Sequence, residues 1–225
     1  MLSMAQDEVR YDRAADWYVG FARQWAAEAR PFLPGDLSGK RVLDVGCGLG
    51  ELSRLVAGRG ASVTALDLSP LMLGHAASHE ADESDQVRYL VGDATTTEWW
   101  DGIPFDVVLC NMALMDIDDL DAAMATCSQV LEPGGWFSFS LLHPCFPGLA
   151  SGSSVQLSSW PPEGGYDSEG WWTTNGDGLR GRVGANHRML STYLNAALRS
   201  GFALEEFREP AAHVPRFFIV RCRRT

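Results

Sequence analysis

The chain has 225 residues, 46% of them hydrophobic and 21% charged, which is typical of one globular domain over residues 1–225. Its net charge of −11 disfavours nucleic acid as a partner, because an acidic surface repels a phosphate backbone. It lacks a signal-peptide pattern, a membrane-spanning apolar run and C-x-x-C pairs, so we expect a cytoplasmic monomer or homodimer with reduced cysteines and no metal site.

The first 35 residues are predicted to form a helical cap. Apolar side chains, Tyr11 and Tyr18 among them, recur at helical spacing from about Ala5 to Arg30. Pro34 then favours a loop. This N-terminal segment therefore precedes the alternation of strands and helices that follows.

From residue 40 to residue 142 the chain alternates between strand patterns and helix patterns. Such alternation implies right-handed crossovers and a parallel sheet, so the expected fold class is a doubly wound α/β fold. The strand at 105–110 is nearly all apolar, which is typical of a strand buried on both faces. Strands are predicted at 41–45, 62–66, 87–91, 105–110 and 136–142, and helices at 52–57, 70–78 and 120–131.

The alternation stops in residues 144–186. This stretch is rich in glycine, serine and proline, yet it holds several aromatic side chains, and disordered segments are poor in aromatics. Long insertions in compact domains are commonly active-site lids, so we interpret 144–186 as a lid that contacts the substrate through Trp171. The aromatic residues of this stretch include Trp160, Tyr166, Trp171 and Trp172.

The C-terminal part is predicted to return to regular structure. A helix is expected at 189–200, closed by Gly201, and strands are expected at 202–207 and 217–221. The short basic run 221–224 is interpreted as a solvated tail.

Three glycines after the first strand predict a ligand site. Gly46, Gly48 and Gly50 let the backbone turn tightly and approach a ligand, at the sheet edge where doubly wound folds bind ligands. The nicotinamide fingerprint places its last glycine one residue later, where this chain has Glu51. Because an acidic side chain at a helix N-terminus opposes a pyrophosphate, the motif favours a cofactor without phosphate.

Two aspartates follow the next two strands. Asp67 could accept hydrogen bonds from both hydroxyls of a ribose, and Asp93 could accept one from an adenine amino group. Each alone is equally well explained as a turn-forming or capping residue. Their order at successive strand ends favours a nucleoside site.

These motifs, in this order, resemble those of class I, Rossmann-like S-adenosylmethionine-dependent methyltransferases that act on small molecules. The resemblance implies a mostly parallel seven-stranded sheet whose last strand is antiparallel and inserted in a hairpin. It also implies S-adenosylmethionine as cofactor, S-adenosylhomocysteine as product, and methyl transfer to an oxygen or nitrogen of a small-molecule acceptor. The segments that carry it are 11–18, 42–50, 66–69, 92–94, 105–111 and 131–135, within residues 8–222.

The resemblance further implies which residues surround the cofactor, from the N-terminal segment and from the ends of the first four strands. The N-terminal Tyr11 and Tyr18 would close over it, although contacts within an amphipathic helix explain them equally well. The methionine part would contact Asp44, Gly46, Cys47 and Gly48, the nucleoside Asp67, Leu68, Met72, Asp93 and Ala94, and the sulfonium Asn111 and Met112.

Acceptor-side residues are predicted after the fifth strand and after the lid. His143 ends the fifth strand, where a neutral imidazole could act as the catalytic base or could instead position the lid. Arg188 could clamp a carboxylate or phosphate of the acceptor, or pair with an acidic residue of the lid. His187 and Tyr193 belong to a pattern that recurs in similar methyltransferases and are expected to contact the acceptor.

Two other functions stay open on the sequence alone. A nicotinamide-dependent oxidoreductase could use a similar fold, but the glycine spacing and the lack of a Tyr-x-x-x-Lys pair at the only lysine, Lys40, argue against it. A catalytically idle, cofactor-binding regulatory protein would keep the same cofactor residues. His75 and His79 lie four residues apart on a predicted helix, but without a third ligand they indicate a solvated helix face.

Overall fold

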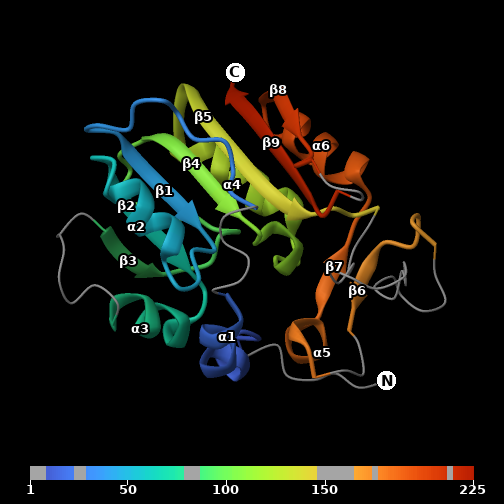
Figure 1. Ribbon diagram of the computed structural model, residues 1–225. Helices are drawn as coiled ribbons and strands as arrows, with labels where there is room; N and C mark the ends of the chain where they lie inside the picture. Colours follow the sequence, from blue (N-terminus) through green and yellow to red (C-terminus); the bar gives the residue numbers. More distant parts are fainter. Residues whose placement is uncertain (1–8, 23–28, 79–86, 146–164, 174–176, 212–214) are drawn as a thin grey trace.

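A seven-stranded sheet forms the centre of the fold (Figure 1). The computed structural model describes residues 9–22, 29–78, 87–145, 165–173, 177–211 and 215–225. The strand order is β3-β2-β1-β4-β5-β9-β8; the first five of these pair in parallel, and β9 runs antiparallel to both of its neighbours. This confirms the doubly wound class and the inserted last strand. The strands of the sheet are β1 (Arg41–Val45), β2 (Ser62–Asp67), β3 (Val87–Val91), β4 (Phe105–Asn111), β5 (Leu131–Leu142), β8 (Phe202–Arg208) and β9 (Phe217–Arg224).

Helices cover both faces of the sheet, because successive strand residues point to opposite faces. Val42 packs in a cluster with Val56 of α2, whereas Leu43 packs in another with Met124 of α4 and Ala196 of α6. Figure 1 shows α2 on one side and α4 and α6 on the other. The helices are α1 (Ala15–Ala22), α2 (Glu51–Ala57), α3 (Pro70–Ser78), α4 (Leu120–Val130), α5 (Leu179–Val183) and α6 (Leu190–Arg199), with the 3-10 turns η1 (Asp12–Ala14) and η2 (Leu114–Asp116).

A serine after β2 ties the N-terminal segment to the sheet. The Ser69 hydroxyl accepts a hydrogen bond from the backbone N–H of Met72 at 3.0 Å and so caps α3. The same hydroxyl donates to Asp12 at 2.5 Å. η1 and α1 are therefore held over the carboxyl ends of β1 and β2, which positions the N-terminal aromatic side chains at the site described below.

Two sequence-based boundaries differ from the structure. β5 begins at Leu131, directly after α4, because Leu131 already pairs with Phe105 at the start of β4. The basic run at the C-terminus is the end of β9 and not a solvated tail: Cys222 is fully buried, and Trp136 on β5 pairs with Arg223. Arg221 and Arg223 lie over the Trp136 ring, so packing draws this charged segment into the sheet.

The described part of the predicted lid contains regular structure that the sequence did not indicate. β6 (Gly170–Trp172) and β7 (Ala185–His187) form an antiparallel pair with α5 between them. Leu190 N–H donates to the Tyr166 hydroxyl at 2.8 Å, which ties this insertion to α6. Trp160 lies outside the described residues.

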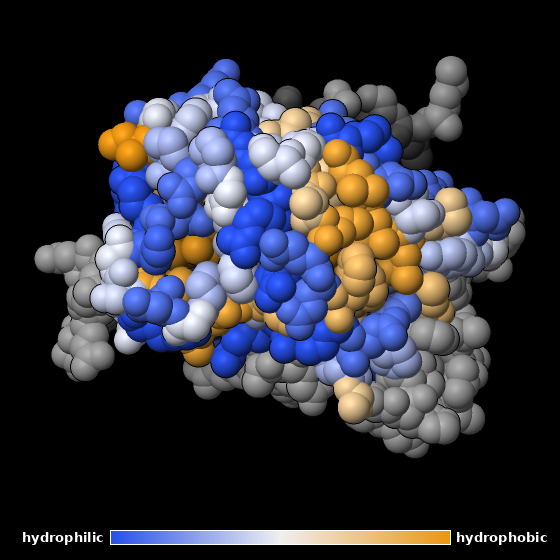
Figure 2. Space-filling model, turned by 90° about the horizontal axis from the view of Figure 1, so that it is seen from above, coloured by the Kyte–Doolittle hydropathy of each residue, from blue (hydrophilic) through white to orange (hydrophobic). Residues whose placement is uncertain are grey.

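The surface is mainly hydrophilic on the face seen from above, with one large hydrophobic area and several smaller ones (Figure 2). In the described portion of the chain, no helix has both the length and the apolar character that crossing a bilayer requires. The same portion holds no group of three or more His, Cys, Asp or Glu side chains arranged to bind a metal. His79, considered above with His75, lies outside the described residues.

Candidate functional site

The turn between β1 and α2 is built on glycines in the left-handed region. Gly46, Gly48 and Gly50 have φ values of +66°, +54° and +72°. A Cβ atom on Gly46 would lie 2.4 Å from the Cβ of Ala113, and one on Gly50 would lie 2.6 Å from the Tyr89 hydroxyl. Both backbone conformation and close approach therefore require glycine here, and they leave main-chain groups facing the adjoining cavity.

Asp44 provides a buried acceptor without a partner. Its side chain is 1% exposed, and one carboxylate oxygen accepts a hydrogen bond from the Ser53 hydroxyl at 2.6 Å. The other oxygen, Oδ1, has no hydrogen-bond partner among the described residues. Burial raises the pKa of Asp44 to about 7, although the bond from Ser53 opposes this shift. A ligand with a positively charged donor would satisfy this oxygen and favour its charged form.

The aspartates after β2 and β3 bind local backbone groups and also face the cavity. Asp67 accepts from the N–H groups of Gly48 at 2.8 Å and Ser69 at 2.9 Å, and burial raises its pKa. Asp93 accepts from the N–H and the hydroxyl of Thr95, each at 2.8 Å. Each carboxylate oxygen has a second lone pair, so turn formation leaves both side chains able to accept from a ligand.

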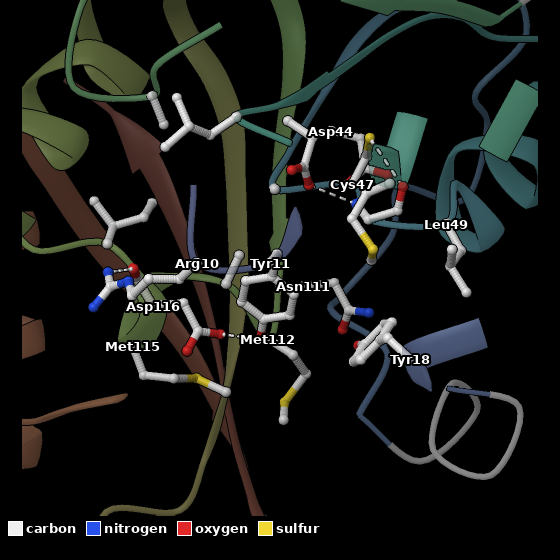
Figure 3. Close-up of a pocket in the computed structure, with 18 of the residues that line it drawn as sticks. Arg10, Tyr11, Tyr18, Asp44, Cys47, Leu49, Asn111, Met112, Met115 and Asp116 are labelled. Carbon is white, nitrogen blue, oxygen red and sulfur yellow. Dashed lines mark hydrogen bonds between the residues drawn. The ribbon is translucent and has the colours of Figure 1, made fainter. Parts of the chain in front are cut away.

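A single cavity of about 940 Å³ connects these residues. We call its two parts the β1–β3 end, which lies beside Asp44, Asp67 and Asp93, and the β4–β9 end, which lies beside Asp116 and Leu142. Figure 3 shows Asp44 and Asp116 on opposite sides of the cavity. All residues predicted to hold the cofactor line this cavity: Tyr11, Tyr18, Asp44, Gly46, Cys47, Gly48, Asp67, Leu68, Met72, Asp93, Ala94, Asn111 and Met112.

The end of β4 has a strained residue in the middle of the cavity wall. Met112 has φ +60°, the only positive φ at a non-glycine among the described residues. Its N–H donates to the carbonyl of Ser140 at 3.0 Å, and the Ser140 hydroxyl donates to Asn111 Oδ1 at 2.8 Å. Such backbone strain persists where surrounding bonds impose it, and it is typical of functional sites.

A hydrogen-bonded group of three elements forms the β4–β9 end. Asp116 of η2 accepts from Arg180 of α5 at 2.6 Å and from the Tyr11 hydroxyl at 2.9 Å, while Arg10 donates to the Asp116 carbonyl at 2.6 Å. Burial would lower the pKa of Arg180, but the Asp116 carboxylate raises it overall. Burial, followed by the charge of Asp116, raises the pKa of Tyr11, which therefore stays a neutral donor.

The structure does not place His143 in the described cavity wall, which corrects its expected role as a base facing the acceptor. The imidazole is 2% exposed. Its Nε2 lies 2.7 Å from Oε1 of Glu209, and its Nδ1 accepts from the N–H of Cys145 at 3.2 Å. Both ring nitrogens are engaged in holding the chain after β5, in agreement with the alternative positioning role.

The four residues expected to contact the acceptor also lie outside the described wall. Arg188 donates to the carbonyls of Leu114, Ile117 and Asp118, so it supports the η2 loop instead of clamping a ligand. His187 Nε2 contacts the Tyr166 carbonyl, and Tyr193 packs in the hydrophobic core. Trp171 lies on the surface, with 54% of its area exposed.

Sequence reasoning missed most of the β4–β9 end. Its described wall includes Trp172 of the predicted lid, further apolar residues such as Met115 and Ile117, and charged residues from five separate segments. Only the acidic run 116–119 after β4 could have indicated this end from the sequence. The remaining charged residues missed are Arg10, Arg30, Arg180 and Arg216.

Comparison with known proteins decides the family. A model described as "Methyltransferase domain" matches residues 43–139. A crystal structure of an S-adenosylmethionine dependent methyltransferase from Mesorhizobium loti is 31% identical, covering 95% of this chain and 99% of that chain, with a TM-score of 0.69. The chain belongs to the S-adenosylmethionine-dependent methyltransferases. This membership overturns the oxidoreductase alternative.

Other relatives of this methyltransferase are more distant or match only in part. A ubiquinone biosynthesis O-methyltransferase from Aromatoleum aromaticum is 39% identical over 110 residues, which are 49% of this chain and 47% of that protein. The chain thus spans about half the length of the curated relatives it matches. A 1,6-didemethyltoxoflavin-N1-methyltransferase from Burkholderia thailandensis has 17% identity and a TM-score of 0.66, covering 96% of this chain and 87% of that one, and shares the fold.

The residues of the methyltransferase fit the cofactor of its family. S-adenosylmethionine has an ammonium group, which suits the unpartnered oxygen of buried Asp44. It has ribose hydroxyls and an adenine, which suit carboxylates with spare lone pairs. It has no phosphate, which suits the acidic β1–β3 end, where the charged residues of the described wall are Asp44, Glu51, Asp67 and Asp93.

Proposed function

We propose that this methyltransferase transfers a methyl group from S-adenosylmethionine to an oxygen or nitrogen of a small-molecule acceptor. One observation carries the proposal: the residues suited to the cofactor fill the β1–β3 end of a cavity that continues into a differently built β4–β9 end. A volume of about 940 Å³ lies near the upper end for small-molecule sites, which leaves room for an acceptor beside the cofactor.

The β1–β3 end would hold the cofactor through fixed polar groups. Asp44 would bind its ammonium group, Asp67 its ribose and Asp93 its adenine amino group. The glycine turn would let the methionine part lie against the backbone. When bound, S-adenosylmethionine supplies an electrophilic methyl group on a positively charged sulfur.

The chain's own contribution to catalysis would be orientation and exclusion of water. Tyr11 and Tyr18 pack edge to face at 5.7 Å and border the cavity with Met112, so they would restrict how an acceptor approaches. Alignment of reactants can contribute roughly 7–11 kcal/mol. Apolar side chains at the β4–β9 end, Met115, Leu142 and Trp172 in the described wall, would exclude water from the acceptor.

An acceptor that loses its proton readily suits this wall. The described wall contains no histidine and no lysine, and burial raises the pKa values of Tyr11, Tyr18 and Cys47, so carboxylates are the proton acceptors available in it. A phenol or a carboxylic acid needs a weaker base than an alcohol. Together with relatives whose printed names denote O-methyltransferases, this supports oxygen over nitrogen.

The test is transfer of an isotopic label. The protein is incubated with S-adenosylmethionine that carries a deuterated methyl group and with a panel of phenols, carboxylic acids and amines, and mass spectrometry follows the label. We expect a labelled small molecule and an equal amount of S-adenosylhomocysteine. Binding of S-adenosylhomocysteine without labelled product from any class would instead support an idle regulatory protein.

Asp67→Ala tests whether this carboxylate binds the cofactor, and Asp106→Asn serves as its control. Loss of this acceptor should weaken binding of S-adenosylhomocysteine by about 1–3 kcal/mol, roughly 5- to 150-fold, measured by calorimetry. Asp106→Asn removes a carboxylate that binds Lys40 at the start of β4, and it should leave the affinity unchanged. Equal affinities of both variants would contradict the assignment of Asp67 to the ribose.

A further inference from the structure

Two arginines at the β4–β9 end come from opposite ends of the chain. Arg30 precedes the loop that leads to β1, and Arg216 immediately precedes β9. Both line the cavity. Every charged residue in the described wall of the β1–β3 end is acidic, so positive charge in this cavity is confined to the other end.

Packing brings the chain neighbours of the two arginines together. Ala29, the neighbour of Arg30, packs in one apolar cluster with Phe217, the neighbour of Arg216. Met112 and Leu142, which also line the cavity, pack against the same cluster. Arg30 and Arg216 therefore adjoin one apolar cluster, which also forms part of the cavity wall at the ends of β4 and β5.

Backbone contacts hold both residues in place. The carbonyl of Arg216 accepts from the backbone N–H of His143 at 2.8 Å, so the main chain at the end of β5 holds the backbone of this arginine. The carbonyl of Arg30 accepts from the Arg208 guanidinium at 2.8 Å. Two residues further on, Phe32 N–H donates to the Ser138 hydroxyl at 2.9 Å. These contacts attach both arginines to the rigid sheet.

The charge of Arg30 is not neutralised by the described residues. Arg10 pairs with Asp118, and Arg180 pairs with Asp116, so these two cations of this end are matched by carboxylates. Within the described part of the chain, the Arg30 guanidinium has no hydrogen bond or ion pair. An unmatched cation beside an apolar floor is suited to an anionic ligand with an apolar body.

We propose that Arg30 and Arg216 bind a carboxylate of the methyl acceptor, whose apolar body lies over Met112 and Leu142. This inference rests on the proposed function, and it narrows the acceptor to an acid with an aromatic or other apolar body. The planar, two-pronged guanidinium matches a carboxylate in shape as well as in charge. The anion clamp expected at Arg188 is thus assigned to a different pair of residues.

The test measures binding of benzoate and of the neutral, similarly shaped benzamide to protein saturated with S-adenosylhomocysteine, by calorimetry or ligand-observed NMR. Benzoate should bind at least tenfold more tightly than benzamide. Arg30→Gln and Arg216→Gln should each weaken benzoate binding at least fivefold. Arg199→Gln removes an exposed arginine of α6 that pairs with Asp121, and it should change nothing. Arg30→Lys should retain only part of the benzoate affinity, because an ammonium group lacks the planar fork.

Unfolding temperature and S-adenosylhomocysteine affinity of each variant separate a lost contact from a damaged fold. Both should match the wild-type values for Arg30→Gln. Equal binding of benzoate and benzamide by the wild type, or full benzoate binding by both glutamine variants, would overturn the inference while leaving the proposed function intact. Failure of the wild type to bind S-adenosylhomocysteine would contradict the proposed function itself.

Discussion

Individual carboxylates at this site combine two tasks. Asp67 holds the glycine turn and the start of α3 through backbone N–H groups, and it faces the cavity as well. Asp44 is bound on one oxygen by Ser53 and keeps its other oxygen free of partners. A ligand that binds such groups finds them already oriented, which reduces the entropy lost on binding.

The raised pKa of Asp44 predicts that cofactor binding depends on pH. Its folded pKa of about 7 lies above the usual carboxyl value near 4, so its contribution to the stability of the free protein is present below about pH 4 and is lost as the pH rises through about 7. The ammonium group of a bound S-adenosylhomocysteine beside Asp44 would favour the charged carboxylate over the protonated form. The affinity for S-adenosylhomocysteine should therefore rise between about pH 5.5 and 7 and then level off, with proton release on binding below pH 7.

Calorimetry in buffers of different ionisation enthalpy measures this proton release. Asp44→Asn should bind more weakly and lose most of the pH dependence, because the amide does not titrate. Asp106→Asn changes a residue near the start of β4, at the opposite end of the strands, and should keep the pH dependence of binding. An unchanged pH profile in Asp44→Asn would show that the ammonium group lies elsewhere.

The placement of His143 predicts that its loss affects stability more than chemistry. His143→Ala removes contacts to Glu209 and Cys145 from a buried position. This should cost about 1–3 kcal/mol, and so lower the unfolding temperature by roughly 2–12 °C. Turnover at 20 °C, measured with any acceptor that the label experiment identifies, should stay within about threefold. A tenfold loss of turnover with unchanged unfolding temperature would restore His143 as the catalytic base.

The residues of the β1–β3 end could be predicted because each is local to a motif. Gly46, Asp67 and Asp93 follow strands that the sequence itself indicates, and parallel strands bring their carboxyl ends to one edge. Arg30 and Arg216 become neighbours only through packing of Ala29 against Phe217. The spacing of apolar residues within one segment does not indicate which distant segment it will contact. The arginines of the β4–β9 end could therefore not be predicted from the sequence.

The 3-10 turn η2 contacts both the N-terminal segment and α5. Its Asp116 carboxylate binds Tyr11 of the N-terminal segment on one oxygen and Arg180 of α5 on the other. The side chains of Asp116 and Arg180 are 13% and 14% exposed, so solvent screens this pair less than a surface pair. Both segments border the cavity, and this one carboxylate connects them there.

Asp116→Asn should loosen these two segments without unfolding the sheet. Hydrogen exchange should become faster in residues 9–22 and 177–183, and S-adenosylhomocysteine should dissociate roughly 5- to 150-fold faster, as expected for a loss of about 1–3 kcal/mol. Asp121→Asn breaks a pair with Arg199 in which both side chains are more than half exposed, and it serves as the control. Equal exchange and dissociation in the two variants would contradict this role of Asp116.

Most elements of the sheet could be predicted, and the reasons for the exceptions are physical. β1, β3 and α3 have the predicted bounds because apolar runs and the Ser69 cap are strong local signals. β6 and β7 have three residues each, which is too short for periodicity to register. The end of β9 is rich in arginine, and only stacking on Trp136 and pairing with Glu205 explain why it forms a strand.

At the scale of the whole molecule, the family match and the cavity divide the chain in the same way. The matched residues 43–139 run from β1 into β5 and supply nearly all of the β1–β3 end. Arg30, Trp172, Arg180 and Arg216 lie outside that range, at the β4–β9 end. Residues 43–139 thus supply most of the β1–β3 end, whereas segments on either side of them supply the arginines of the β4–β9 end.

Thermal unfolding with S-adenosylmethionine, S-adenosylhomocysteine and NAD added separately tests the central claim most directly. A ligand present at a hundred times its dissociation constant stabilises the folded state by roughly 2.7 kcal/mol, which for a domain of this size is about 5–10 °C. We predict that both sulfur nucleosides raise the unfolding temperature by this amount and that NAD leaves it unchanged. A rise with NAD and none with the sulfur nucleosides would contradict the assignment of the β1–β3 end to S-adenosylmethionine.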